Sequence, residues 1–199
     1  MNRADTVTEI RTAQPRYIGW RYWAAGKMDL DGEIRPVLLS PAIRNARWLD
    51  ATTHTSTCAA PLWARHAAPV GPECGCGIRI VRRLPNLIHY MRKRHQQEPG
   101  VDPLLGPCVA IGRVEGWGHI EPGVPWRSKD IGDPSDTIRA ESVRILGPLF
   151  FSPAIAVWQD DFHRYFPVQR RSSGLGTYQE WLTRISRLSD AKRKQPWPA

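Results

Sequence analysis

The stretch Cys108-Val-Ala-Ile-Gly-Arg-Val-Glu-Gly-Trp-Gly-His119 has the composition of a β-strand, yet it contains three glycines. These are Gly112, Gly116 and Gly118. Glycine inside a strand is typical of places where the strand bends or where another group approaches closely. The stretch therefore predicts a strongly bent strand, and it predicts that Cys108 is a buried core thiol.

A second strand is predicted over residues 17–23 (YIGWRYW), where aromatic side chains alternate with small or polar ones. Strict alternation along a strand would place Arg21 on the same face as Trp23. Tryptophans flanked by glycine in bent strands usually fill the space that the missing side chains open. We therefore expect Trp20 and Trp117 to be substantially buried on neighbouring strands.

Residues 33–39 (EIRPVLL) predict a third strand, which forms a hairpin with residues 17–23. Pro36 restricts this strand to an edge or to a bulged position, because proline has no N–H to donate. Residues 27–32 (KMDLDG) are expected to form the turn.

The remaining elements follow from apolar spacing and from turn residues. They are a short strand at 77–82, a helix at 84–97 with Pro85 in its first turn, a turn at 121–123 leading to 126–129, an apolar piece at 145–151, and helix-like segments at 158–166 and 178–188. This order predicts an α+β fold. We expect a small, strongly bent antiparallel sheet or open barrel with one main helix, a Cys/His metal-type loop and a helical C-terminal extension.

The composition changes along the chain predict four parts. Residues 1–16 form a disordered N-terminus, 17–150 a main β-rich domain with the Cys/His loop, 151–190 a helical accessory segment, and 191–199 a disordered basic tail. The longest apolar stretch, 146–158, is interrupted by two prolines, so no membrane partner is expected. The sequence predicts a soluble, cytoplasmic protein.

Four residues have the spacing C-x7-H-x7-C-x-C, namely Cys58, His66, Cys74 and Cys76, in a segment rich in Pro and Gly. Thiolates and one imidazole are the ligands of a tetrahedral structural zinc site, so these residues predict a bound Zn²⁺. His54 and His119 are reserve ligands. The alternative is that Cys74 and Cys76 pack at a turn and that His66 is an ordinary loop histidine.

Several short motifs resemble a family of uncharacterised actinobacterial and phage-borne proteins. They are G-W-R-x-W at 19–23, H-x-A-P at 66–69, C-x-C-G-I at 74–78 and G-x-V-x-x-W-G at 112–118. The resemblance covers roughly residues 17 to 130 and departs from the family at Arg79 and Ile80. It implies that these elements occur together, without implying an activity.

The net charge of +9 is concentrated in two clusters of basic residues. Residues 77–97 carry six basic residues and no acidic ones, and residues 164–194 carry an excess of six positive charges. We predict that nucleic-acid phosphates are contacted by a basic face, with one tryptophan available to stack on a base. Its residues are Arg82, Arg83, Arg92, Lys93, Arg94, Trp126, Arg127 and Lys129.

The sequence thus favours a non-enzymatic, zinc-stabilised binding module that contacts nucleic acid. The first alternative is an adaptor for a protein or a small ligand, with a Trp-lined pocket and residues 158–188 as its docking surface. The second alternative is an enzyme. It is disfavoured because the sequence contains no G-x-S-x-G, Walker or G-x-G-x-x-G motif, and Asp160, Asp161 and His163 are explained by a solvated helix face.

Overall fold

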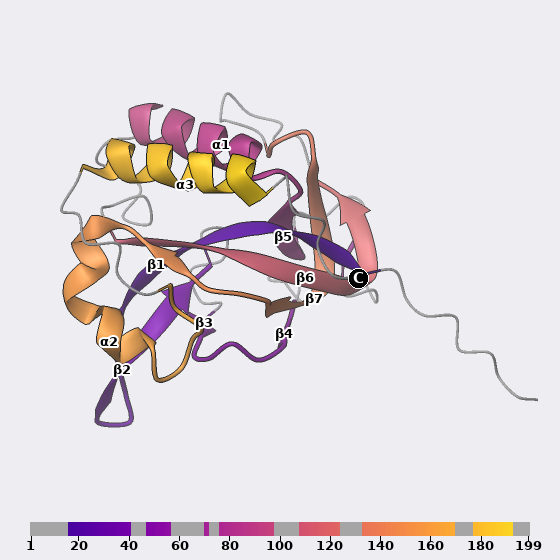
Figure 1. The fold of residues 1–199 in the computed structure, drawn as a ribbon. Coiled ribbons are helices and arrows are strands. Elements are labelled where there is room, and N and C mark those ends of the chain that lie inside the picture. Colours follow the sequence, from indigo (N-terminus) through magenta and orange to yellow (C-terminus); the bar gives the residue numbers. More distant parts are fainter. Residues whose placement is uncertain are drawn as a thin grey trace, which may run out of the picture.

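The computed structural model describes residues 16–40, 47–56, 70–71, 76–97, 108–123, 133–169 and 177–192. Within these residues the protein is a mixed fold, in which an antiparallel eight-stranded sheet is combined with a few helices (Figure 1). In chain order the elements are β1 (Tyr17–Leu30), β2 (Glu33–Leu39), β3 (Arg47–Trp48), β4 (His54–Thr55), β5 (Ile78–Val81), α1 (Leu84–Gln97), β6 (Val109–Pro122), β7 (Thr137–Ile145), β8 (Phe150–Phe151), the 3-10 helix η2 (Pro153–Trp158), α2 (Gln159–Phe162) and α3 (Tyr178–Lys192). The predicted antiparallel sheet is confirmed.

The sheet bends strongly, because its central strands pair in a circuit. Their order is β1, β5, β7 and β6, and β6 pairs again with β1 over eight positions from Tyr17 to Ala24. The circuit is not a clean barrel, since β1 and β5 pair only where Trp20 lies opposite Val81. The strands β2 and β3 extend the sheet beyond β1.

The first hairpin is tighter than the sequence analysis predicted. Strand β1 continues to Leu30, so the turn consists of Asp31 and Gly32 rather than residues 27–32. Both residues have positive φ angles, 56° and 86°, which two-residue hairpin turns require and which an Asp-Gly pair adopts readily. Pro36 lies opposite Lys27, in a part of β2 that β3 does not reach.

The bend predicted in the glycine-rich strand is confirmed in β6. The pairing of β6 with β7 shifts register between Trp117 and Ile120, and Gly118 between them has a φ of +84°. At Gly116 a Cβ atom would collide with Ile80 and Ala140. The glycines therefore permit both the change of direction and the close approach of the neighbouring strands.

The strand that returns alongside β6 is β7, which the sequence analysis did not predict. The return strand predicted at 126–129 lies outside the described residues. The 84–97 helix is confirmed with its predicted bounds as α1. The helix-like segment predicted at 158–166 was too long, because α2 ends at Phe162.

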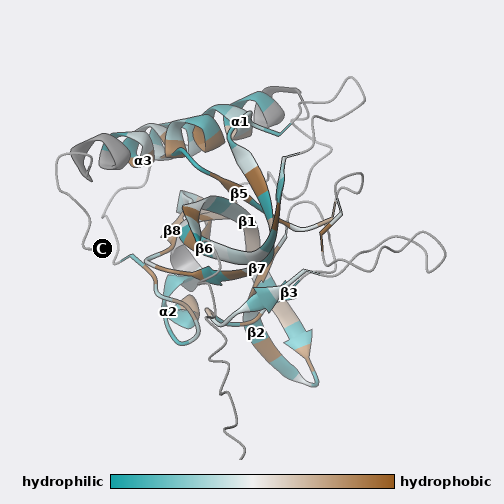
Figure 2. Ribbon diagram, turned by 90° about the vertical axis from the view of Figure 1, so that its right-hand side faces the viewer, coloured by the Kyte–Doolittle hydropathy of each residue, from teal (hydrophilic) through white to brown (hydrophobic). Residues whose placement is uncertain are grey.

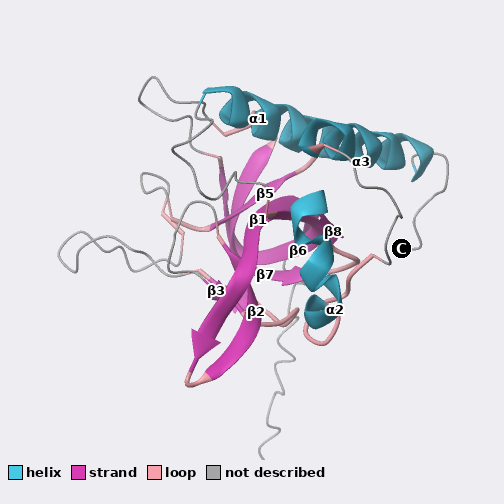
Figure 3. Ribbon diagram, turned by 90° about the vertical axis from the view of Figure 1, so that its left-hand side faces the viewer, coloured by secondary structure: helices cyan, strands magenta, loops and turns pink. Residues whose placement is uncertain are grey.

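Two groups of buried apolar side chains form the core. One includes Trp23, Leu38 and Trp48 together with Phe162 from α2. The other lies between the sheet and the two long helices, and includes Trp181 from α3. Figure 3 shows α1 and α3 as one layer, with α2 on another side of the sheet beside the β1–β2 hairpin.

The burial predicted for three residues is only partial. Trp20 and Trp117 lie on β1 and β6, which are neighbouring strands as expected, but both are half-buried. The buried tryptophans among the described residues are Trp23, Trp48 and Trp181, and Trp23 has no exposed surface. Cys108 is also only half-buried, because it lies just before β6 rather than within the strand.

The C-terminal segment is joined to the sheet by polar as well as apolar contacts. Lys27 on β1 forms an ion pair with Asp161 on α2 at 2.6 Å, and its ammonium group lies 5.8 Å from the centre of the Trp158 ring.

The boundaries proposed for the four parts of the chain stay predictions. Among the described residues, no helix has the length and apolar character needed to cross a membrane.

Candidate anion-binding sites

Of the four predicted zinc ligands, the structure describes one, Cys76. Its side chain is buried, and its Sγ accepts a hydrogen bond from the backbone N–H of Gly71 at 3.4 Å. Cys58, His66 and Cys74 lie outside the described residues. Within the described part of the chain no three His, Cys, Asp or Glu side chains are grouped for a metal, so the zinc site stays a prediction.

The two reserve ligands make other contacts. His54 stacks on Trp48, with ring centroids 3.9 Å apart, and His119 Nε2 lies 2.9 Å from Glu121 Oε1. Burial lowers the pKa of His54 below its usual value, and the positive charge of Arg21 lowers it further. Neither contact directs these imidazoles towards Cys76.

The predicted nucleic-acid residues begin just before α1. Arg82 and Arg83 are both exposed there. The Arg83 backbone N–H donates to Asp136 Oδ2 at 2.9 Å, and its Nε approaches the same oxygen at 3.3 Å. Arg83 is therefore partly neutralised by Asp136, whereas Arg82 extends its charge into solvent.

The helices α1 and α3 lie side by side (Figure 1), so that basic residues from both clusters of the sequence lie on neighbouring helices. Figure 2 colours parts of both helices as hydrophilic. Arg92 on α1 donates from Nη2 to Thr183 Oγ1 on α3 at 3.1 Å. Lys93 on α1 and Arg187 on α3 are exposed, and Arg184 is partly exposed. Residues that are about ninety positions apart in the sequence therefore belong to one helical layer.

The structure does not describe four of the other predicted contact groups. Arg94 lies in α1, but its side chain is among those not described, and Trp126, Arg127 and Lys129 lie outside the described residues. The structure thus places Arg82, Arg83, Arg92 and Lys93 at α1 and gives no placement for the predicted stacking tryptophan.

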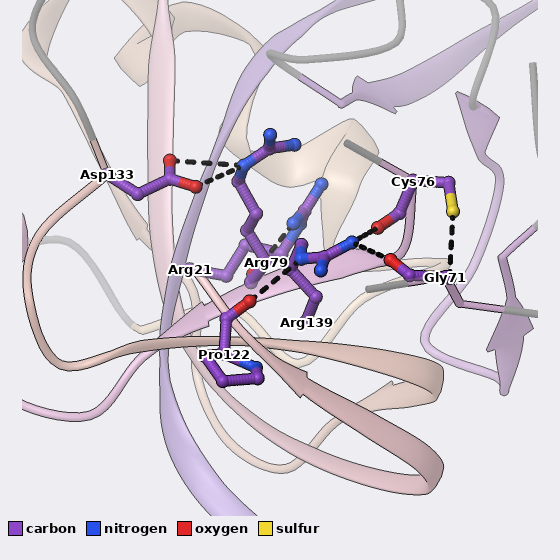
Figure 4. Close-up of polar contacts among 7 residues, drawn as sticks. All are labelled: Arg21, Gly71, Cys76, Arg79, Pro122, Asp133 and Arg139. Atoms are coloured by element: carbon purple, nitrogen blue, oxygen red, sulfur yellow. Dashed lines mark hydrogen bonds and ion pairs between the residues drawn. The ribbon is translucent and has the colours of Figure 1, made fainter. Parts of the chain in front are cut away.

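A second group of basic residues, which the sequence analysis missed, lies within the sheet (Figure 4). Arg79 on β5 lies directly opposite Arg139 on β7. Like charges at opposite positions of two strands repel each other, so this pair requires compensation. Asp133 provides part of it, because its two carboxylate oxygens accept hydrogen bonds from Arg79 Nε at 3.1 and 2.8 Å.

Arg139 is buried and anchors three stretches of backbone. Its Nε donates to the carbonyl oxygen of Pro122 at 2.9 Å, and its Nη1 donates to those of Gly71 and Cys76 at 3.0 and 2.8 Å. These bonds fix Gly71 and Cys76 against β7. The residues on either side of the undescribed positions 72–75 are therefore held by one guanidinium group.

Arg21 on β1 is the third member of this group and is 5% exposed. Its Nη1 donates to the carbonyl oxygen of Arg79 at 2.8 Å, and its Nη2 donates to Ser40 Oγ. The guanidinium carbon lies 5.8 Å from the centre of the Trp23 ring and 5.6 Å from that of Trp48. Burial, and then the charge of Arg79, lower the pKa of Arg21 to about 9.

The surroundings of Arg21 supply hydrogen-bond donors in excess. Two buried N–H groups, Arg21 Nε and Trp23 Nε1, have no hydrogen-bond partner among the residues that the structure describes. Such orphaned donors are uncommon in protein interiors and call for an explanation. The sequence contained one relevant signal, because strand alternation places Arg21 and Trp23 on the same face, but it could not show that Arg79 and Ser40 meet them.

Comparison of the chain with protein-family models, curated proteins and solved structures finds no match. Inference about function therefore rests on the residues and contacts of this chain.

Proposed function

We propose that this protein is a non-enzymatic binding module that contacts nucleic-acid phosphates through the outer face of α1 and α3. The observation that carries the proposal is the packing of these two helices, marked by the Arg92–Thr183 hydrogen bond. It joins two basic clusters that the sequence keeps apart. A continuous basic face with few acidic residues is the electrostatic footprint of a phosphate-binding surface.

The contacts of each basic residue indicate which of them bind phosphate and which hold the protein together. Lys93 and Arg187 are exposed, and Arg82 is exposed at the start of α1, so their charges are available to phosphates. Arg83 is held by Asp136, and Arg92 connects the two helices. We therefore assign the phosphate contacts first to Arg82, Lys93 and Arg187.

The adaptor alternative combined a Trp-lined pocket with residues 158–188 as a docking surface, and it stays a prediction. Three aromatic side chains of this range, Phe162, Phe166 and Trp181, are buried in the two cores. Three others, Trp158, Tyr165 and Tyr178, are half-buried. The basic outer face is the feature of these helices that remains available for binding.

A structural zinc remains part of the proposal. Cys76 is buried at the start of β5, and an N–H···S hydrogen bond such as the one from Gly71 suits a thiolate. Cys58, His66 and Cys74 would complete the ligand set. The zinc would hold the 58–76 segment against the sheet and would supply stability rather than chemistry.

Charge reversal on both helices tests the proposal. We expect Lys93→Glu combined with Arg187→Glu to weaken binding of a mixed-sequence oligonucleotide at least tenfold, with little change in melting temperature. The matched control also reverses two charges, Arg35→Glu on β2 and Arg47→Glu on β3, two strands that lie away from α1 and α3 (Figure 1). Unchanged affinity in the double variant, or an equal loss in the control, would overturn the proposed interface.

A further inference from the structure

We propose that Arg21, with the indole N–H of Trp23 and the neighbouring Arg79, forms a binding site for a small oxyanion of the phosphate class. This site lies within the sheet, whereas the proposed nucleic-acid interface lies on α1 and α3. The inference does not depend on that interface.

The first argument is the hydrogen-bond balance of Arg21. A guanidinium group carries five N–H donors. The structure gives Arg21 two acceptors, the Arg79 carbonyl oxygen and Ser40 Oγ, and leaves the buried Nε without one. Among the described residues no carboxylate contacts Arg21, so neither its charge nor its donors are fully satisfied by the protein.

The second argument is that the neighbouring side chain of Trp23 also carries a buried N–H group without an acceptor among the described residues. Trp23 is fully buried, and its Nε1 also lacks an acceptor. The Arg21 guanidinium carbon is 5.8 Å from the Trp23 ring centre, so the two side chains that carry these donors are neighbours. Leaving a buried donor without an acceptor destabilises the folded protein.

The third argument is the positive charge around Arg21. Its carbonyl partner is Arg79, whose positive charge is, after burial, the second cause of the lowered pKa of Arg21. Asp133 contacts Arg79 through Nε alone. Asp133 compensates the charge of Arg79, whereas no carboxylate among the described residues pairs with Arg21. The buried charge of Arg21 lies in a poorly solvated place, where an anion interacts strongly.

These properties define the chemistry of the ligand. Orphaned donors and excess positive charge require an acceptor that carries negative charge. A phosphate group offers several acceptor oxygens and matches the planar fork of arginine. Since Trp23 and Trp48 are buried, the part of the ligand that meets Arg21 must be no larger than the phosphate group itself.

The phosphate could be free in solution or could be the terminal phosphate of a nucleic-acid strand. Both present the same oxygens to Arg21. Titration with inorganic phosphate, and with two oligonucleotides that differ only in a 5′-phosphate, distinguishes these sources.

The direct test is a titration of the protein with inorganic phosphate, followed by ¹H–¹⁵N NMR at constant ionic strength. We expect the indole N–H signal of Trp23 and the Nε–H signal of Arg21 to shift in a saturable way. The Trp23 signal is assigned by its loss in Trp23→Phe. Chloride at the same ionic strength should leave both signals in place. If neither signal responds to phosphate or to the 5′-phosphorylated strand in the folded protein, the proposal is wrong.

Substitution of Arg21 provides the second test. Arg21→Lys retains the charge but removes the planar fork, so phosphate affinity should fall at least tenfold, while Arg35→Lys on the exposed hairpin should leave it unchanged. Equal affinity in Arg21→Lys would overturn the assignment. If Arg21→Lys does not fold, the titration of the unaltered protein decides alone.

Discussion

At the scale of single residues, close packing around Gly116 fixes how β6 lies against its neighbours. A Cβ at this position would meet the Ala140 Cβ at 2.9 Å and would collide with Ile80. We expect Gly116→Ala to lower the free energy of unfolding by about 1 to 3 kcal/mol, the usual cost of overpacking a core.

Gly26 on β1 is the matched control, because nothing lies within 4 Å of a Cβ placed there. Gly26→Ala should change the stability by no more than about 1 kcal/mol and should tend to increase it. Urea denaturation of both variants measures the difference. Equal stability of the two would contradict the close approach of β6 to Ile80.

His54 makes the stability depend on pH. Burial, the largest cause, and the charge of Arg21 lower its pKa below the ordinary value of 6.5, while the Asp50 backbone and carboxylate act in the opposite direction. The unfolded chain therefore binds a proton more readily than the native protein. The stability associated with neutral His54 is present above pH 6.5 and decreases as the pH falls below it.

The prediction is that the unaltered protein loses more stability than His54→Asn between pH 7.5 and pH 5. Chemical denaturation at several pH values measures both, and the difference between the two profiles isolates His54 from the other titrating groups. Parallel profiles would show that His54 has an ordinary pKa.

At the scale of elements, α3 is attached to the molecule by its aromatic side. Trp181 is buried with Leu182 and Ile185 between α3, α1 and the sheet. Trp181→Ala should therefore cost about 3 to 5 kcal/mol. Gln179→Ala, an exposed position two residues earlier on the same helix, should have little effect. A small effect of Trp181→Ala in thermal unfolding would mean that α3 is not anchored in this way.

The elements also show how far the sequence predicts the fold. Helix α1 was predicted with its bounds, because Pro85 and the spacing of Leu87, Ile88 and Met91 are local signals. The Asp31-Gly32 turn had a local signal that was overlooked. Strand β7 was missed, because its pairing with β5 and β6 is set by residues distant in the sequence.

The candidate sites were likewise predicted only where local sequence determines them, and missed where residues distant in the sequence meet. Spacing along α1 predicted a basic helix, whereas only the packing of α3 shows that Arg187 joins it. The cluster around Arg21 depends on contacts with Ser40 and with Arg79, which is fifty-eight positions away in the chain. No local pattern encodes such a contact, so the sequence alone could not predict it.

At the scale of the whole molecule, the predicted zinc would join the 58–76 segment to the sheet at Cys76. We expect about one zinc per chain in purified protein and a lower melting temperature after chelation. Cys76→Ser should remove the metal, whereas Cys108→Ser, just before β6, should retain it. A metal-free protein with an unchanged melting curve would contradict the zinc site.

The central claim is that α1 and α3 together form a nucleic-acid interface, and the salt dependence of binding tests it most directly. A plot of the logarithm of the binding constant against the logarithm of salt concentration should be steep and nearly independent of nucleotide sequence. Replacing Lys93 and Arg187 with Glu should reduce the slope by about two, one for each lost phosphate contact. A slope that is shallow in the unaltered protein, or the same in the double variant, would contradict the claim.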